Sequence, residues 1–178
     1  NAQNSTPCSL PANDYGDLMY MSSVSTSGAT TDLSYTNSVQ GSLIDFTNTY
    51  TLVAERNSTV TFTYTPGYYN TESALYVDLD DDGLYEFDER LAYNSHGSAY
   101  PPTFSATIPD SPGSYHMRLL FDYYGTGASN GDSDIPNTGC PTTLYYAQAH
   151  DLKITITEAA SCGSPSGLAA TVAEYSSG

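Results

Sequence analysis

Alternation of apolar and polar residues at every second position recurs along the chain and restricts it to a fold built from strands. In residues 59–64, Val60, Phe62 and Tyr64 alternate with threonines. This period is typical of half-buried strands, and Pro-Gly and Asp-Gly turn signals separate the segments. The remaining positions expected to face the core are Phe104, Ala106, Ile108, Tyr115, Met117, Leu119, Phe121, Leu152, Ile154 and Ile156.

The sequence therefore predicts an all-β protein, an antiparallel β-sandwich of the jelly-roll or immunoglobulin-like kind. Residues 1–158 form the expected sandwich, with one edge strand at 17–24 and a loop with little core at 29–42. Small residues at 159–166 read as a linker. Residues 167–178 are expected to be the first strand of a following module, or a strand exchanged with a neighbouring copy. The residues of that tail expected to pair are Leu168, Ala170, Val172 and Tyr175.

The charge of the chain excludes several classes of partner. Four basic residues stand against 20 acidic ones, so the net charge is −16. Binding to nucleic acid or to anionic lipid needs clustered Lys and Arg, so neither partner is expected. No run of 18 apolar residues occurs, and membrane insertion is not expected. The first residues show no signal peptide, as expected of a secreted protein after processing.

The three cysteines, Cys8, Cys140 and Cys162, contain no C-x-x-C pair, which argues against a zinc site. In an oxidising compartment two of them would form a disulfide and one would be left over. The preferred pair is Cys8 with Cys140, which would tie the N-terminal arm to a loop before the last strand. Three reduced cysteines are the alternative.

One motif carries chemistry: residues 78–89 read D-L-D-D-D-G-L-Y-E-F-D-E and match the calcium-loop pattern D-x-[DN]-x-[DN]-G-x5-E. Gly83 at position 6 permits the sharp turn of such a loop. Calcium takes six to eight oxygen ligands. The loop positions expected to supply them are Asp78, Asp80, Asp82, the carbonyl of Leu84, Glu86 and Glu89.

The flanks of this loop show that it does not belong to a helical EF-hand pair. Residues 74–77 read as a strand, and residues 90–93 are too short and aromatic for a partner helix. Calcium would therefore be structural, stabilising the fold by mass action. The alternative is a solvated acidic hairpin tip. Further acidic and amide side chains that are candidates to complete or duplicate the site are Asp122, Asn130, Asp132 and Asp134.

The order of these motifs resembles the GEVED domain family, a β-sandwich module of secreted and surface proteins of Bacteroidota. The resemblance rests on Y-V-D-L-D-D-D-G-L-Y-E-F-D-E-R, then T-F-S-A-T-I-P-D, then S-Y-H-M-R-L-L-F-D-Y, and covers about residues 76–156. The final strand departs from the family signature G-E-V-E-D-Y. Gln148 and His150 replace the two glutamates, and only Asp151 survives. The tail C-G-S-P-S-G-L-A-A-T resembles the opening of a fibronectin type III-like module.

The resemblance implies an extracellular, non-catalytic module and names no ligand. No H-E-x-x-H, G-x-S-x-G or P-loop motif occurs, and His96, His116 and His150 are far apart, with the last two expected to face outward. The leading hypothesis is a calcium-stabilised module for adhesion or fibre assembly, in contact with neighbouring modules or copies of itself. The alternatives are an accessory domain of a secreted peptidase or other hydrolase, and a carbohydrate-binding module that uses the paired tyrosines at 68–69, 123–124 and 145–146.

Overall fold

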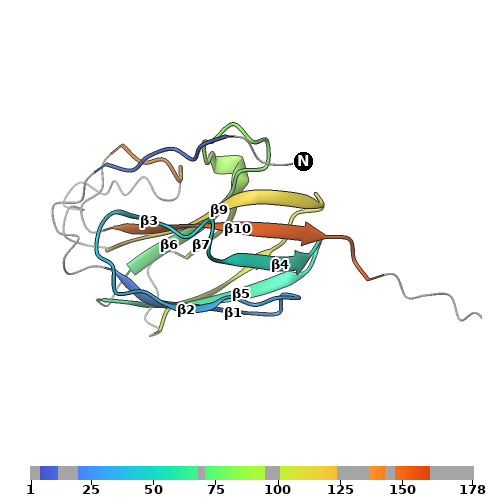
Figure 1. Ribbon diagram of the computed structural model, residues 1–178, viewed down its shortest axis with the longest axis horizontal. Coiled ribbons are helices and arrows are strands. Elements are labelled where there is room, and N and C mark those ends of the chain that lie inside the picture. The colour runs from blue at the N-terminus through green and yellow to red at the C-terminus, as the bar shows by residue number, and fades with distance from the viewer. Residues whose placement is uncertain are drawn as a thin grey trace, which may run out of the picture.

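Two β-sheets packed face to face form the part of the chain that the structure describes, which comprises residues 5–11, 20–67, 71–94, 101–123, 137–142 and 147–160 of a computed structural model (Figure 1). The elements are β1 (Met21–Ser27), β2 (Ser34–Thr36), β3 (Leu43–Asp45), β4 (Thr51–Glu55), β5 (Thr59–Pro66), β6 (Thr71–Val77), the 3-10 helix η1 (Phe87–Glu89), β7 (Arg90–Asn94), β8 (Thr103–Thr107), β9 (Gly113–Tyr123) and β10 (Gln148–Thr157). The predicted all-β sandwich is confirmed at this level.

The smaller sheet has the strand order β2-β1-β5-β8, and the larger sheet has the order β3-β10-β9-β6-β7. In the larger sheet, β3 and β4 lie one after the other along the same edge of β10, and both run parallel to it. All other pairs are antiparallel. The expectation of a purely antiparallel sandwich is therefore wrong at this edge. Residue alternation identifies a strand, but it does not specify the direction of the neighbouring strand.

The inner faces of the two sheets form one apolar core. Val60, Phe62 and Tyr64 of β5 are fully buried against Met117 and Leu119 of β9 and the isoleucines of β10. The Phe62 and Phe104 rings stack across β5 and β8, with centroids 5.5 Å apart. The inward positions predicted from the period-two pattern lie in this core, with Tyr115 packed at its margin.

Two expectations for the N-terminal third are wrong. Strand β1 pairs with β2 on one side and β5 on the other, so it is not an edge strand. Residues 29–42 include β2 and bury Leu33, Tyr35 and Asn37, so this segment contributes to the core. These side chains are separated by short polar stretches, and a run of three residues is too short to show a period.

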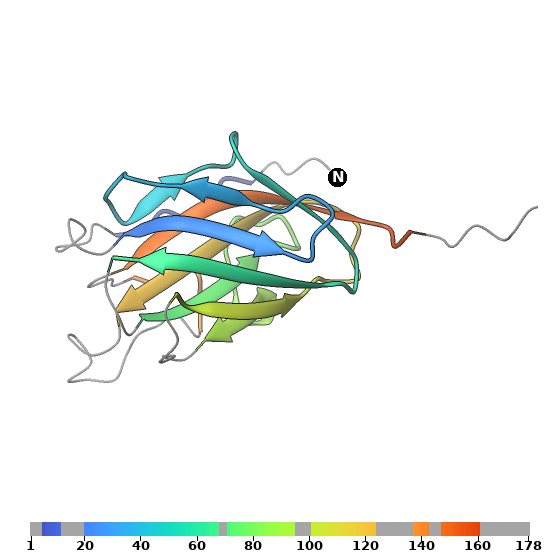
Figure 2. The same ribbon diagram turned by 90° about the horizontal axis from the view of Figure 1, so that it is seen from below.

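The outer face of the smaller sheet carries only hydroxyl side chains, and Figure 2 views the molecule from this side. Several hydroxyls pair across strands, as between Thr61 and Ser105 at 2.9 Å and between Ser23 and Thr65 at 2.9 Å. Such pairs stabilise a sheet whose outer face meets water. The positions are Ser23, Ser25, Ser27, Ser34, Thr36, Thr59, Thr61, Thr63, Thr65, Thr103, Ser105 and Thr107.

Much of the outer face of the larger sheet is covered instead. A second apolar cluster lies there, made of Ala74, Tyr76, Tyr85, Leu120 and Ala149, with Cys8, Leu10 and Cys140 packed against it. The cover comes from an N-terminal arm (residues 5–11), the acidic loop (78–89) and a late loop (137–142). Figure 1 shows the arm and η1 above this sheet, on the side away from the smaller sheet. Around Ala74, Leu120 and Ala149 the larger sheet is therefore buried on both faces, and the acidic loop is part of this cover. The same outer face is exposed at Ser114.

Candidate metal centre

The acidic loop connects β6 to β7, which are neighbouring antiparallel strands. Its backbone turns sharply at two points, where Asp81 has φ +66° and Gly83 has φ +87°. Gly83 stands at the position that the calcium-loop pattern reserves for glycine, and a positive φ favours glycine there. The two residues with positive φ therefore close this segment into a tight loop, which brings its aspartate side chains together.

The carboxylates of Asp78, Asp80 and Asp82 meet in this loop, each with an oxygen within 4.8 Å of the others. Asp78 is fully buried, while Asp80 and Asp82 are exposed. Backbone N–H groups of the loop hold all three. The N–H of Asp81 donates to Asp78 Oδ1 at 2.8 Å, that of Asp82 to Asp80 Oδ1 at 3.2 Å, and that of Leu84 to Asp82 Oδ1 at 2.7 Å. Backbone N–H groups thus position one oxygen of each of the three carboxylates.

Glu89, the last loop position, is carried by η1 and reaches back across the loop. Its Oε1 accepts the N–H of Leu79, and its Oε2 accepts the N–H of Glu86 at 3.3 Å. The side chain is buried, and its pKa is raised to about 7, chiefly by that burial. The Glu86 side chain and the Asp78 charge contribute to this shift, while the two backbone N–H groups act against it. A nearby cation would favour the ionised form.

Of the six predicted ligand positions, the close group contains the three aspartates, and Glu86 and Glu89 lie outside that group. Glu89 is nevertheless bound to Leu79, the residue directly after Asp78. The side chain of Leu84 is 46% exposed, which is consistent with a position that offers only its carbonyl. These donors are all oxygens, which suits a hard cation such as calcium.

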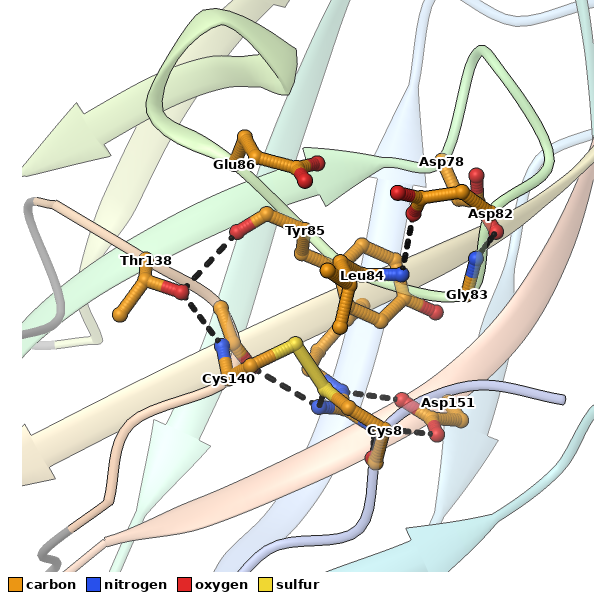
Figure 3. Close-up of a disulfide and its surroundings, with 12 residues drawn as sticks. Cys8, Asp78, Asp82, Gly83, Leu84, Tyr85, Glu86, Thr138, Cys140 and Asp151 are labelled. Carbon is orange, nitrogen blue, oxygen red and sulfur yellow. Dashed lines mark hydrogen bonds and ion pairs between the residues drawn. A yellow bond between two sulfur atoms is a disulfide. The ribbon is translucent and has the colours of Figure 1, made fainter.

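The predicted disulfide between Cys8 and Cys140 is confirmed and joins residues 132 apart in sequence. It ties the arm to the late loop, and both segments contact the acidic loop (Figure 3). The N–H of Cys8 donates to the carbonyl of Gly83 at 2.8 Å, and the N–H of Gly139 donates to the carbonyl of Tyr85 at 2.8 Å. The acidic loop is therefore held by two other segments of the chain.

Arg118 on β9 lies beneath these segments, fully buried. It forms a bidentate pair with Asp151 on β10, with Nε to Oδ1 at 2.6 Å and Nη2 to Oδ2 at 2.8 Å. The other N–H groups donate to the carbonyl of Gly139 at 2.8 Å, the carbonyl of Cys8 at 2.8 Å and Cys8 Sγ at 3.0 Å. All five donors of the guanidinium are satisfied. The Tyr85 ring lies against it, 4.6 Å from ring centroid to Cζ.

The alternation of residues 115–121, with Tyr115, Met117, Leu119 and Phe121 facing the core, predicts that Arg118 faces outward. The structure places it on the outer face of β9, where the arm and the late loop cover it. The missed signal is the pairing of β9 with β10, which places Arg118 directly opposite Asp151. In a chain with only four basic residues, an arginine and an aspartate on neighbouring strands are good candidates for an ion pair.

His150 does not face outward, and that expectation is wrong. It shares the inner face of β10 with Leu152 and is fully buried between the sheets. Gln148 Oε1 accepts the N–H of Met21 at 2.8 Å, so the histidine Nε2, 3.0 Å away, donates to the same oxygen. Its Nδ1 then accepts from the Tyr35 hydroxyl at 2.9 Å. Burial lowers the pKa of His150 to about 3, so the ring is neutral.

His116 lies on the opposite face of the larger sheet from His150, so these two residues do not form a joint zinc site. Asp122 is buried on β9 opposite Glu72 of β6, away from the aspartate group of the loop. The other proposed members of a second calcium site, Asn130, Asp132 and Asp134, lie outside the described residues. So do His96, Cys162, the tail positions Leu168, Ala170, Val172 and Tyr175, and the paired tyrosines, apart from the backbone of Tyr123.

These features define an all-β module in which one sheet carries a second layer on its outer face. That layer consists of the N-terminal arm, the acidic loop and the late loop, and the Cys8–Cys140 disulfide links the arm to the late loop. No family model matches the chain, and a search of curated proteins finds no match. Within the described ranges, no helix has the length and hydropathy needed to cross a membrane.

Proposed function

We propose that this chain is a calcium-stabilised, non-catalytic module of a secreted or cell-surface protein that serves adhesion or structural assembly. The observation that carries the proposal is the convergence of Asp78, Asp80 and Asp82 within 4.8 Å. Three carboxylates at this distance repel one another, and a divalent cation among them removes that repulsion. Glu89 adds a fourth carboxylate across the start of the loop.

The composition supports a cation rather than basic side chains as the neutralising partner. The chain has only four Lys and Arg residues against 20 acids. Arg118 pairs with Asp151, and Arg56 pairs with Asp110 and Glu158. Two of the four basic side chains are therefore engaged elsewhere. Calcium modules outside the cell bind the ion with Kd on the order of 10⁻⁴–10⁻³ M, which is the range expected under this proposal.

The disulfide supports a location outside the reducing cytoplasm, because such bonds persist in oxidising compartments. The resemblance to the GEVED family supports the same assignment. Under this proposal the cation holds a loop on the outer face of one sheet, and the module presents its other surfaces to neighbouring modules or copies of itself. The tail at 167–178 is the proposed contact for assembly by strand addition.

The decisive experiment is thermal unfolding in calcium and in EGTA, for the native chain and for Asp80→Ala. At calcium concentrations of about 100 Kd, mass action adds about 2.7 kcal/mol, which raises Tm by roughly 5–10 °C for a chain of this length. Asp80→Ala should remove that shift. Asp88→Ala is the matched control, because it deletes an exposed carboxylate in the same loop outside the proposed ligand set.

A native Tm that does not move with calcium would refute the proposal, as would an equal shift in Asp80→Ala. Light scattering after size exclusion, in calcium and in EGTA, tests the assembly part separately. A species larger than one chain that disappears on removal of 167–178 supports strand addition, whereas a single-chain mass in both conditions contradicts it.

A further inference from the structure

The N-terminal arm contacts the acidic loop through the carboxylates themselves, not only through its backbone. Ser5 Oγ donates to Asp78 Oδ2 at 3.1 Å and to Asp81 Oδ1 at 2.7 Å, and the Ser5 N–H donates to the same Asp81 oxygen at 3.1 Å. Asp78 is the buried member of the proposed ligand set, and Asp81 is the neighbouring acid outside it. The serine therefore orients one ligand and holds the competing carboxylate aside.

The arm lies so close to the loop that it leaves no room at the turn. A Cβ added to Gly83 would approach the Thr6 carbonyl to 2.5 Å, and the Cys8 N–H donates to the Gly83 carbonyl at 2.8 Å. The glycine that gives the loop its turn is thus also the point where the arm packs. Any movement of the arm changes the surroundings of Asp78 and Gly83 together.

The late loop holds the other end of the acidic loop. Thr138 Oγ1 donates to the Tyr85 carbonyl at 3.2 Å, and the Cys140 N–H donates to Thr138 Oγ1 at 3.0 Å (Figure 3). Neither 5–11 nor 137–142 belongs to a strand of either sheet. Their position on the sheet depends on the Cys8–Cys140 bond, on the contacts with Arg118 and on the small apolar cluster around Tyr85.

We infer that the N-terminal arm is one wall of the cation site, with Ser5 as a positioning residue, and that the Cys8–Cys140 disulfide is therefore coupled to cation affinity. This inference rests on the proposed function. Breaking the disulfide removes the covalent part of what holds the arm and leaves only the Arg118 contacts, the Gly83 hydrogen bond and the apolar cluster, so the groups that orient Asp78 and hold Asp81 aside are fixed less firmly. Coupling between two equilibria is reciprocal, so calcium must in turn make the disulfide harder to reduce.

The chemical step is an ordinary thiol–disulfide exchange with an external dithiol. One thiolate of the dithiol attacks a sulfur of the pair to give a mixed disulfide, and its second thiolate releases the protein. The protein gains two electrons and two protons as two thiols, and the dithiol becomes a cyclic disulfide. Dithiothreitol supplies this chemistry in the test.

The first measurement is calcium affinity by isothermal titration calorimetry in a Cys162→Ser background, which leaves only the pair of interest. We expect the Cys8→Ser/Cys140→Ser variant to bind calcium about 10-fold more weakly than the oxidised chain, since hydrogen bonds to a charged group are lost. Ser5→Ala should weaken binding in the same direction with the disulfide intact. Ser34→Ala, an exposed serine on β2, is the matched control and should have no effect.

The second measurement leaves the cysteine pair unchanged, so it decides the question even where the double serine variant does not fold. The reduction midpoint of the disulfide is determined in dithiothreitol buffers, with saturating calcium and with EGTA. A 10-fold coupling lowers the midpoint potential by about 30 mV in calcium. Asp80→Ala should abolish that difference.

The outcomes separate the two proposals. No calcium binding by the oxidised native chain overturns the proposed function, and with it the inference. Equal calcium affinity with and without the disulfide, together with a midpoint that calcium does not move, overturns the inference alone. Weaker binding by Ser5→Ala together with a calcium-dependent midpoint supports both.

Discussion

The buried histidine between the sheets predicts a specific loss of stability on acidification. His150 contacts Tyr35, Gln148 and Phe46, all uncharged, and donates its only N–H to Gln148. Its pKa falls from 6.5 to about 3 because the charged ring would be desolvated. The unfolded chain therefore binds a proton as pH falls through 6.5, while the folded chain does not. This stability is complete above pH 6.5 and is lost as pH falls towards 3.

The size of the effect follows from the two pKa values. Acidification from pH 7 to pH 5 costs about 2 kcal/mol through His150, and the loss approaches about 5 kcal/mol below pH 3. Glu89 acts in the opposite sense, because its pKa is raised from 4.5 to about 7 in the folded chain. Its contribution is complete below pH 4.5 and is lost as pH rises through 7. Between pH 7 and pH 5 it regains about 2 kcal/mol, so the two residues nearly cancel in the native chain.

The assay must therefore compare variants rather than follow the native chain alone. Urea unfolding at pH 7 and pH 5, in EGTA and in a Glu89→Gln background, should show the loss of about 2 kcal/mol that belongs to His150. His150→Gln in the same background should remove that pH dependence. His116→Gln, a change at a half-buried histidine on the neighbouring strand, should retain it. If His150→Gln keeps the full pH dependence, the reasoning about the buried neutral ring is refuted.

Two further predictions concern the second layer. Arg118→Met should lower the free energy of unfolding by about 3–5 kcal/mol, because Asp151 is left buried and unpaired, and Arg118→Met/Asp151→Leu should recover part of the loss in urea unfolding. An additive double variant would contradict the ion pair. Gly83→Ala should cost about 1–3 kcal/mol more than Gly41→Ala. Both glycines have positive φ, but a Cβ meets Thr6 only at Gly83 and nothing within 4 Å at Gly41. Equal costs would show that the arm does not pack against the turn.

The sequence predicts the core well because the core depends on a local pattern. Val60, Phe62 and Tyr64 alternate with threonines over six residues, and the structure buries all three. The same holds for Leu152, Ile154 and Ile156, where the alternation is equally regular. His150 has the same parity as these residues and therefore belongs to the inner face. The error there came from treating an imidazole as a surface group, when the chain supplies Tyr35 and Gln148 as buried partners.

The second layer was not predictable in the same way, because its parts are distant in sequence and irregular in structure. The aspartate spacing identifies the acidic loop, and the cysteine count suggests one bond. Neither signal shows that Arg118 lies between that bond and Asp151, or that Ser5 reaches the loop carboxylates. A period of two distinguishes the two faces of a strand, but it does not say whether the second face meets water or another part of the chain. Here a buried arginine on that face requires partners for five N–H groups, and the arm and late loop supply the carbonyls that β10 alone lacks. The arm and the late loop therefore both complete the hydrogen bonds of Arg118 and hold the acidic loop. A substitution of Arg118 should consequently also change the position of the arm against Asp78.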